Sequence, residues 1–313
     1  MNWQPAAGPE VLAARARLLA ETRDFFVEHG VLEVQTPVLV GGTCPDPAVP
    51  SIPASPAGGR SMFLHTSPEH AMKRLLCAGS GDIYQVCPVF RDGESGRLHN
   101  PEFTMVEWYR TGFDQRRMAR ETVALVARLL QRELDPLELT YGEAFRQTVG
   151  IDPHTADAES LERVCHEHGI ATPQQADRDA LLDLLLSTVI ATGFAADRCH
   201  VVYDYPASQA ALARISATKP FVAERFEVFF GSVELANGFH ELSDPAEQRR
   251  RFTAERQQHA HEQAPPLDER LLAALDHGLP DCAGVALGFD RVLMLATGCT
   301  SIADVLSFPF ERI

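Results

Sequence analysis

Residues 90–109 read FRDGESGRLHNPEFTMVEWY, and this stretch decides the fold. Its first part, 91–100, carries charges of both signs and two glycines but no apolar cluster, which predicts a polar loop between two strands. On a strand predicted over 103–110, the two-residue repeat places four side chains on one face: Phe103, Met105, Glu107 and Tyr109. A carboxylate and a phenol that share a face with an aromatic ring indicate a functional site rather than a core.

The segments around this stretch alternate between helix and strand patterns. Helical spacing of apolar residues predicts helices over 11–27, 68–76 and 245–264, and short apolar runs predict strands over 31–34, 82–90, 201–205 and 225–235. A strand, a glycine and a helix follow one another over 285–296. Between 115 and 193 the pattern is mostly helical and acidic, so we expect a helical insertion there.

The composition restricts the classes of function. With 313 residues, 45% of them hydrophobic, the chain can build a sizeable core, and we find no secretory or membrane-spanning segment, so we expect a cytoplasmic protein. A formal net charge of −15 argues against general binding to nucleic acid. The seven cysteines form no Cys-x-x-Cys pair, which favours reduced thiols. Neither lysine, Lys73 or Lys219, follows a glycine, which excludes a Gly-Lys-Ser/Thr phosphate loop.

Three segments, in this order, resemble the signature motifs of class II aminoacyl-tRNA synthetases, specifically the lysine branch. Residues 25–37 resemble the first motif, which builds the dimer interface in that family. Residues 90–94 with 99–109 resemble the second motif, and 284–291 the third. Residues 234–242, ELANGFHEL, add a match characteristic of the lysine enzymes. The resemblance implies an α+β fold, an antiparallel sheet flanked by helices, and a homodimer.

The position of the first motif points to a paralogous family. It begins at Phe25, which leaves no room for the anticodon-binding barrel of lysyl-tRNA synthetases. We therefore expect one catalytic domain over 1–313, with a mostly helical insertion at about 112–200. This compact form resembles the elongation factor P (R)-β-lysine ligases, and so do the segments 67–69 and 203–209. Ala286 stands where lysyl-tRNA synthetases usually have glycine, so it either shapes the substrate pocket or simply packs.

The resemblance implies activation of an amino acid by ATP as an aminoacyl-adenylate. Arg91 would grip the α-phosphate and the carboxylate, while Phe103 stacks on adenine and Arg291 covers its other face. The nucleotide site would also include Asp92, Gly93, Asn100, Glu234, Leu235 and Gly288. The lysine enzymes usually have glutamate at the position of Gly93, so either Glu94 takes that role or the contact becomes a backbone one.

Glu234 and Glu241 resemble the Mg²⁺ ligands of the family, and carboxylate oxygens suit that ion. They are seven residues apart, so they would point to opposite faces of an unbroken strand. We therefore expect the turn-forming pair at 237–238 to break the strand and bring the two carboxylates together. Solvent-facing glutamates remain the alternative.

A doubly cationic amino acid, lysine or (R)-β-lysine, needs anions in its pocket. The candidates are Glu69, Glu107 and Glu241, with Tyr109 hydrogen-bonding nearby, and the sequence does not show which glutamate takes which amine. The resemblance adds Ser67, Pro68, Asn237 and Ala286 to the substrate site. The implied acceptor is a lysine of elongation factor P. The alternatives are a stand-alone synthetase that charges tRNA or another small acceptor, and an inactive amino-acid sensor.

Overall fold

The computed structural model describes residues 3–46, 48–59, 61–174, 176–258 and 265–313. The chain divides into two compact units. Unit 1 comprises Met1–Phe113, Leu125–Arg132 and Ser243–Ile313, and unit 2 comprises Asp114–Ala124 and Glu133–Leu242. Both combine helices with mostly antiparallel strands, which confirms the expected α+β class. None of the helices in the described ranges is long and apolar enough to cross a membrane.

The central strands of unit 1 come from residues 90–109 and from the segments next to them. Strands β5 (Ile83–Phe90) and β6 (Glu102–Thr111) pair antiparallel, and β11 (Cys282–Gly288) pairs antiparallel with β6. The short β1 (Leu32–Glu33) pairs parallel with β5. The register places Gln85 and Ala286 on either side of Glu107. Glu107 therefore lies on a central strand, with a paired strand on each side.

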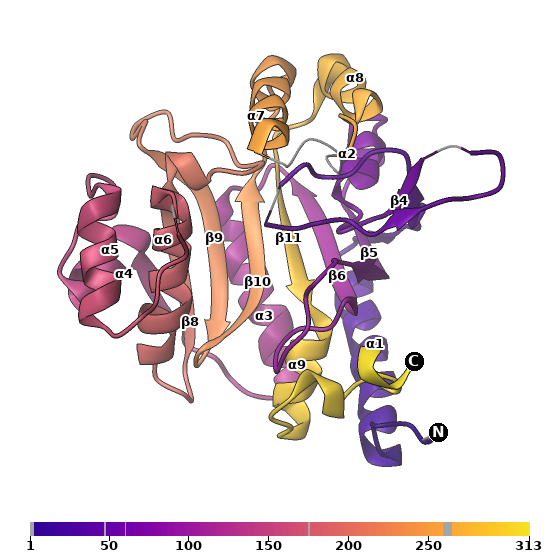
Figure 1. Cartoon of the computed structure of the whole chain (residues 1–313). Coiled ribbons are helices and arrows are strands. Elements are labelled where there is room, and N and C mark those ends of the chain that lie inside the picture. Colours follow the sequence, from indigo (N-terminus) through magenta and orange to yellow (C-terminus); the bar gives the residue numbers. More distant parts are fainter. Residues whose placement is uncertain (1–2, 47, 60, 175, 259–264) are drawn as a thin grey trace. The chain divides into compact units, whose positions relative to one another are not determined.

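Helices close both ends of these strands. Helix α1 (Pro9–Glu28) buries Phe26, whose ring stacks on Tyr84 of β5 with centroids 4.1 Å apart. Figure 1 shows α2 (Glu69–Cys77), α7 (Pro245–Gln258) and α8 (Glu269–Gly278) beyond one end of β6 and β11, and α9 (Phe289–Thr297) beyond the other. The remaining pieces of this unit are the small sheet β2 (Leu39–Val40), β4 (Met62–Leu64) and β3 (Pro53–Ala54) and two 3₁₀ turns, Ile302–Asp304 and Phe310–Arg312.

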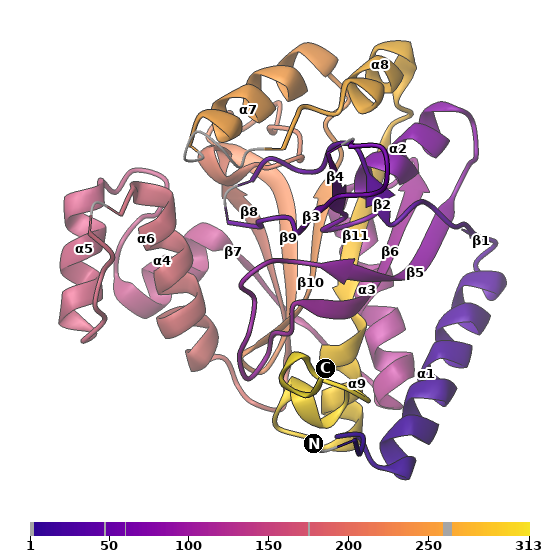
Figure 2. The ribbon, with the colours of Figure 1, turned by 45° about the vertical axis from the view of Figure 1, so that its right-hand side comes forward.

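Unit 2 builds its own sheet and helical layer. The strands β7 (Leu137–Thr140), β8 (Cys199–Pro206), β9 (Val222–Phe230) and β10 (Val233–His240) pair in this order, the first pair parallel and the others antiparallel. Helices α4 (Tyr141–Val149), α5 (Ala158–Glu167) and α6 (Arg178–Leu185) pack together (Figure 2), followed by a π-helical turn at Leu186–Ile190 and 3₁₀ turns at Ala191–Gly193 and Ala207–Gln209. The long helix α3 (Gln115–Leu130) is shared between the units.

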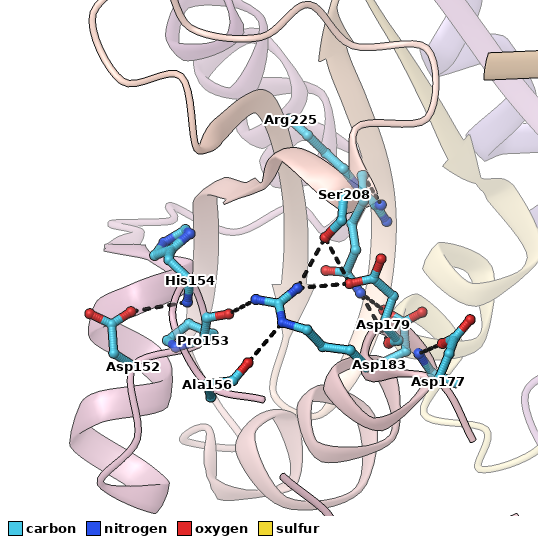
Figure 3. Close-up of polar contacts among 12 residues, drawn as sticks. Asp152, Pro153, His154, Ala156, Asp177, Asp179, Asp183, Ser208 and Arg225 are labelled. Atoms are coloured by element: carbon cyan, nitrogen blue, oxygen red, sulfur yellow. Dashed lines mark hydrogen bonds and ion pairs between the residues drawn. The ribbon is translucent and has the colours of Figure 1, made fainter. Parts of the chain in front are cut away.

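The segment 203–209 anchors the helices of unit 2 to its sheet (Figure 3). Arg178, at the start of α6, donates to the carbonyls of Pro153 and Ala156 and to the Ser208 hydroxyl, 3.1 Å away. The Gln209 amide donates to Asp183 Oδ1 at 2.8 Å, and Arg225 of β9 donates to the Gln209 carbonyl at 3.0 Å. This part of the sequence therefore has a clear structural role.

One predicted element differs from the structure, and another is described only in part. The single strand expected over 225–235 is wrong: β9 and β10 form a hairpin that turns at Gly231, whose φ of +53° suits glycine. An apolar run cannot show where one strand ends and its antiparallel partner begins. The helix expected over 245–264 is confirmed as far as Gln258, and residues 259–264 lie outside the described residues.

Candidate active site

Arg91 is held at the start of the polar loop. Its backbone N–H donates to the Pro101 carbonyl at 2.9 Å, which closes the base of the loop. Its guanidinium lies over the Phe103 ring, 5.1 Å from the centroid, and Nη1 is 3.5 Å from Glu94 Oε1. Its buried Nε has no hydrogen-bond partner among the described residues. The side chain is thus oriented while it keeps donor capacity for an oxyanion.

The third motif is tied to the second. Arg291, in the first turn of α9, donates to the Leu98 carbonyl at 3.3 Å and lies 2.8 Å from His99 Nε2. Next to it, the buried Asp290 accepts from the Thr104 backbone N–H at 2.6 Å and pairs with Arg15 of α1. Burial raises the pKa of Asp290, against the charge of Arg15. The pattern gave no signal for Arg15 or Asp290, because their pairing joins residues far apart in sequence.

Of the other residues of unit 1 that we predicted to bind the nucleotide, some are exposed and others already contact the protein itself. Asp92 and Gly93 are exposed, and Gly93 has a φ of +72°. The Asn100 amide is already engaged, because Nδ2 donates to the Glu102 carbonyl at 2.7 Å and Oδ1 accepts from the Phe310 N–H at 2.9 Å. Asn100 therefore shapes the turn that precedes Phe103. Gly288 pairs with Met105 and caps the start of α9.

The structure brings the predicted substrate residues of unit 1 together. The carboxylate of Glu107, which is 2% exposed, accepts from Tyr109 Oη at 2.8 Å and from Ser67 Oγ at 2.6 Å. The same Ser67 oxygen accepts the backbone N–H of Glu69 at 3.0 Å. Pro68 caps helix α2, and Ala286 pairs with Glu107 across the strands. Two carboxylates, a hydroxyl and a phenol form one polar cluster.

Two residues of this cluster escaped sequence reasoning. Gln85, 2% exposed, pairs with Glu107 on the other side, and its Oε1 has no partner in the described part of the chain. Lys73 is fully buried and donates to Glu69 Oε1 at 2.6 Å. Lys73 and Glu69 have the i,i+4 spacing of an ordinary helix pair. What marks both residues is that their polar side chains are buried beside a carboxylate. Sequence spacing does not show burial, so neither residue could be predicted.

A further carboxylate, Glu255 of α7, is affected by the charge of Glu69. Burial raises its pKa to about 7, and the negative charges of Asp46 and Glu69 add to the effect. Its buried Oε2 has no hydrogen-bond partner among the described residues. Nothing in the helical pattern of α7 distinguished Glu255 from a solvent-facing glutamate.

Replacing Glu255 by glutamine should stabilise the protein at pH 8 but hardly at pH 5. Because the pKa of Glu255 is raised, the folded state keeps the proton at pH values at which the unfolded chain has lost it. The free energy of unfolding therefore falls as the pH rises from the ordinary pKa of a glutamate to above 7. The gain above that range should approach about 3 kcal/mol. Urea denaturation at both pH values measures it, and an equal change at both would contradict it.

The carboxylates predicted to hold Mg²⁺ lie on β10 and directly after it. The strand runs unbroken through Asn237, so the expected break there is wrong. Instead, the register with β9 shifts between Glu234 and Ala236, which makes Leu235 a bulge residue. One extra residue reverses the alternation, so Glu234, Asn237 and Glu241 share a face. A bulge at Leu235, and not a turn at Asn237, therefore brings the two carboxylates to one face.

The strand beside this face carries a buried ion pair. Arg225 Nη2 lies 2.6 Å from Glu227 Oε1, and Glu227 pairs with Asn237 across the hairpin. Burial raises the pKa of Glu227 to about 7, against the charge of Arg225 and with that of Glu234. Sequence reasoning missed this pair, because alternation on a strand does not show which charged residues are buried.

The donor set of unit 2 fits Mg²⁺. Within the described residues no group of three or more His, Cys, Asp or Glu side chains is placed to hold a metal. Mg²⁺ is usually bound through one or two carboxylates together with substrate phosphates and water. Glu234 and Glu241 on one face provide such a pair.

The comparisons with known proteins agree with the motifs. Residues 5–312 match the family described as tRNA synthetases class II (D, K and N). Proteins named elongation factor P–(R)-β-lysine ligase from Haemophilus ducreyi and Pasteurella multocida are 45% and 46% identical to the chain, covering 100% and 99% of it and 97% and 98% of their own length. The protein of that name from Pectobacterium carotovorum is 44% identical, with 99% and 98% covered. The expected class II catalytic fold is thereby confirmed, and the chain belongs to the class II tRNA synthetase family of the D, K and N group.

Proposed function

We propose that the chain is an ATP-dependent ligase that activates (R)-β-lysine, or lysine, and transfers it to a lysine side chain of elongation factor P. The names of the relatives support the acceptor and the amino acid. The observation that carries the proposal is the buried Glu107 carboxylate beside Glu69, because an anionic pocket suits an amino acid with two ammonium groups. The compact chain acts as one catalytic domain in this proposal.

In the first step, the carboxylate of the amino acid attacks the α-phosphorus of ATP, the bond to the β-phosphate oxygen breaks, and pyrophosphate leaves. Negative charge spreads over the phosphate oxygens, so the protein supplies positive charge and positioning rather than a base. Arg91 supplies positive charge at the α-phosphate. Phe103 stacks on one face of adenine, and Arg291 covers the opposite face of the base. Nucleotide contacts come further from Asp92, Gly93 and Gly288.

In the second step, the neutral amine of the acceptor lysine attacks the acyl carbon, AMP leaves, and the amine loses a proton. The amino acid is held by its ammonium groups at Glu107 and Glu69. Ser67, Pro68, Tyr109 and Ala286 shape the pocket. Glu234 and Glu241 would hold Mg²⁺, which offsets the charge of the phosphates when it is bound.

ATP–pyrophosphate exchange tests the proposed activity. Purified protein is assayed with (R)-β-lysine, with α-lysine and without amino acid. Exchange that depends on either lysine supports adenylation, and a preference for the β-isomer supports the ligase. No exchange with any amino acid would contradict the proposal and favour an inactive sensor. The presence of Arg91 and Arg291 argues against a sensor, because a protein that only senses an amino acid does not need to bind phosphate.

We also propose that the protein acts in the cytoplasm as a homodimer, built through the first motif. Val27, at the end of α1, is 73% exposed and Leu32 of β1 is 58% exposed, and both belong to that motif. Exposed apolar side chains close together in sequence favour burial against a second copy.

The double substitution Val27→Glu and Leu32→Glu should convert the dimer to a monomer, because it places charges where apolar contacts are expected. Light scattering after size-exclusion chromatography should show 34.4 kDa instead of twice this mass. The matched control is Leu137→Glu, at a residue 42% exposed on β7. A monomeric wild type, or a double variant that remains dimeric, would refute this interface.

A further inference from the structure

A small cavity lies beside the first turn of α2. Its volume is about 30 Å³, and its lining includes His65, Ser67, Glu69 and His70. A polar cavity of this size has room for one water molecule. The cavity therefore adjoins Glu69, a carboxylate that we assign to the amino-acid site.

His65, which lines the cavity, has an unpaired hydrogen-bond acceptor. The residue is 2% exposed, and its Nε2 lies 2.8 Å from the Pro88 carbonyl oxygen. Because a carbonyl oxygen only accepts, Nε2 carries the hydrogen, and Nδ1 of the neutral ring is an acceptor. Burial lowers the pKa of His65, although the hydrogen bond to Pro88 opposes this, so the neutral ring is favoured. The buried Nδ1 has no partner among the residues that the structure describes.

His70 also lines the cavity and also has one unpaired nitrogen. Its Nδ1 lies 3.2 Å from Oδ2 of Asp268, the residue that caps α8. Burial alone would raise the pKa of Asp268, but the hydrogen bond from His70 and two backbone N–H groups lower it, so Asp268 is a charged acceptor and Nδ1 donates to it. The buried Nε2 has no partner within the described ranges. Two imidazole nitrogens are thus left for one small occupant.

Water suits both nitrogens better than a cation does. One water molecule can donate to Nδ1 of His65 and to Nε2 of His70, and it can accept from His70 when that ring is protonated. An ammonium group can only donate. Metals that bind imidazole take three or four protein ligands, and no three His, Cys, Asp or Glu side chains of the described chain are placed to hold a metal. The chemistry of the two rings therefore favours water.

We propose that this cavity binds one water molecule between His65 and His70, and that the water fixes the first turn of α2, which carries Glu69. The backbone of His65 is held on both sides: its N–H donates to the Val38 carbonyl at 3.0 Å, and its carbonyl accepts the Phe90 N–H at 3.0 Å. The water thus links a fixed point of the fold to the residue next to Glu69. Both histidines are positioning residues, and their role rests on the proposed function because Glu69 is assigned there.

Asparagine and glutamine distinguish the two nitrogens of each ring. The amide of asparagine lies near the position of Nδ1, and the amide of glutamine lies near that of Nε2. His65→Gln and His70→Asn therefore lose the group that contacts the water. His65→Asn and His70→Gln keep that group and lose the contact with Pro88 or Asp268 instead. The two histidines thus predict opposite orders of effect for the same pair of substitutions.

Pyrophosphate exchange measures these effects. His65→Gln and His70→Asn should each raise the KM for the amino acid about fivefold, the effect of one buried hydrogen bond, and leave the KM for ATP nearly unchanged. His65→Asn and His70→Gln should raise the KM for the amino acid less. His166→Asn, at an exposed side chain, is the control and should change neither value. Circular dichroism establishes that each variant is folded. Equal effects of both substitutions at each histidine would overturn the role of the water, because the loss would then follow the ring and not the contact.

A crystal structure of the wild type tests the site independently of activity. At a resolution that shows ordered water, we expect one molecule within hydrogen-bond distance of both nitrogens, and its loss in His65→Gln. A wild-type structure without this water would overturn the inference and leave the proposed function intact. Absence of exchange in the wild type with either lysine would overturn the proposed function and the positioning role with it, whereas the electron density alone decides on the water.

Discussion

Replacement of Arg91 by alanine should lower kcat/KM for pyrophosphate exchange by about a thousandfold, which corresponds to about 4 kcal/mol of transition-state stabilisation. The guanidinium is oriented by the Phe103 ring and by Glu94, and its buried Nε has no partner among the described residues. A charge arranged in advance needs no reorganisation when negative charge develops on the α-phosphate. The loss should therefore appear mainly in kcat.

The control for Arg91→Ala is Arg97→Ala in the same loop. Arg97 is exposed and donates to the Thr300 carbonyl at 3.2 Å, so its removal deletes a charge from the loop without touching the ring of Phe103. Exchange by this variant should stay within a fewfold of wild type. If Arg91→Ala retained a comparable rate, the assignment of Arg91 to the phosphate would be wrong.

Glu107→Gln should raise the KM for the amino acid about a hundredfold, because a buried ammonium would lose its charged partner, a loss of about 3 kcal/mol. Glutamine has nearly the same shape, so the hydroxyls of Ser67 and Tyr109 keep a neighbour and the fold should survive. The measurement is exchange at saturating ATP, with the amino acid varied. The KM for ATP, measured separately, should change little.

The matched variant is Glu102→Gln, an exposed glutamate on the same strand. Its KM for the amino acid should equal that of the wild type. Similar effects of the two substitutions would mean that the overall negative charge, rather than the buried carboxylate, attracts the substrate. That result would remove Glu107 from the amino-acid site.

Alternation on a strand correctly placed two residues of the polar cluster in unit 1. The two-residue period placed Glu107 and Tyr109 on one face, and their side chains are in contact. Helical spacing located α1 and α2, whose ends differ from the predicted ones by a few residues. Local spacing predicts these elements because each of them buries one face against its neighbours.

The sequence could not show features that depend on the paired strand or on burial. The bulge at Leu235 is a property of two strands together, so the spacing of Glu234 and Glu241 posed a problem that it could not solve. Lys73 and Glu255 follow ordinary helical patterns, and only tertiary packing separates them from surface charges. The Asn100 side chain accepts a hydrogen bond from the backbone of Phe310, 210 residues away, and local sequence patterns do not show such a contact.

Label transfer tests the central claim most directly. The protein is incubated with ATP and radiolabelled (R)-β-lysine, together with elongation factor P, with the same factor lacking its acceptor lysine, or with tRNA. We expect label on the intact factor alone, in a bond that resists mild alkali, because an amide is stable where the ester of an aminoacyl-tRNA is hydrolysed. Label on tRNA, released by mild alkali, with none on the factor, would contradict the account.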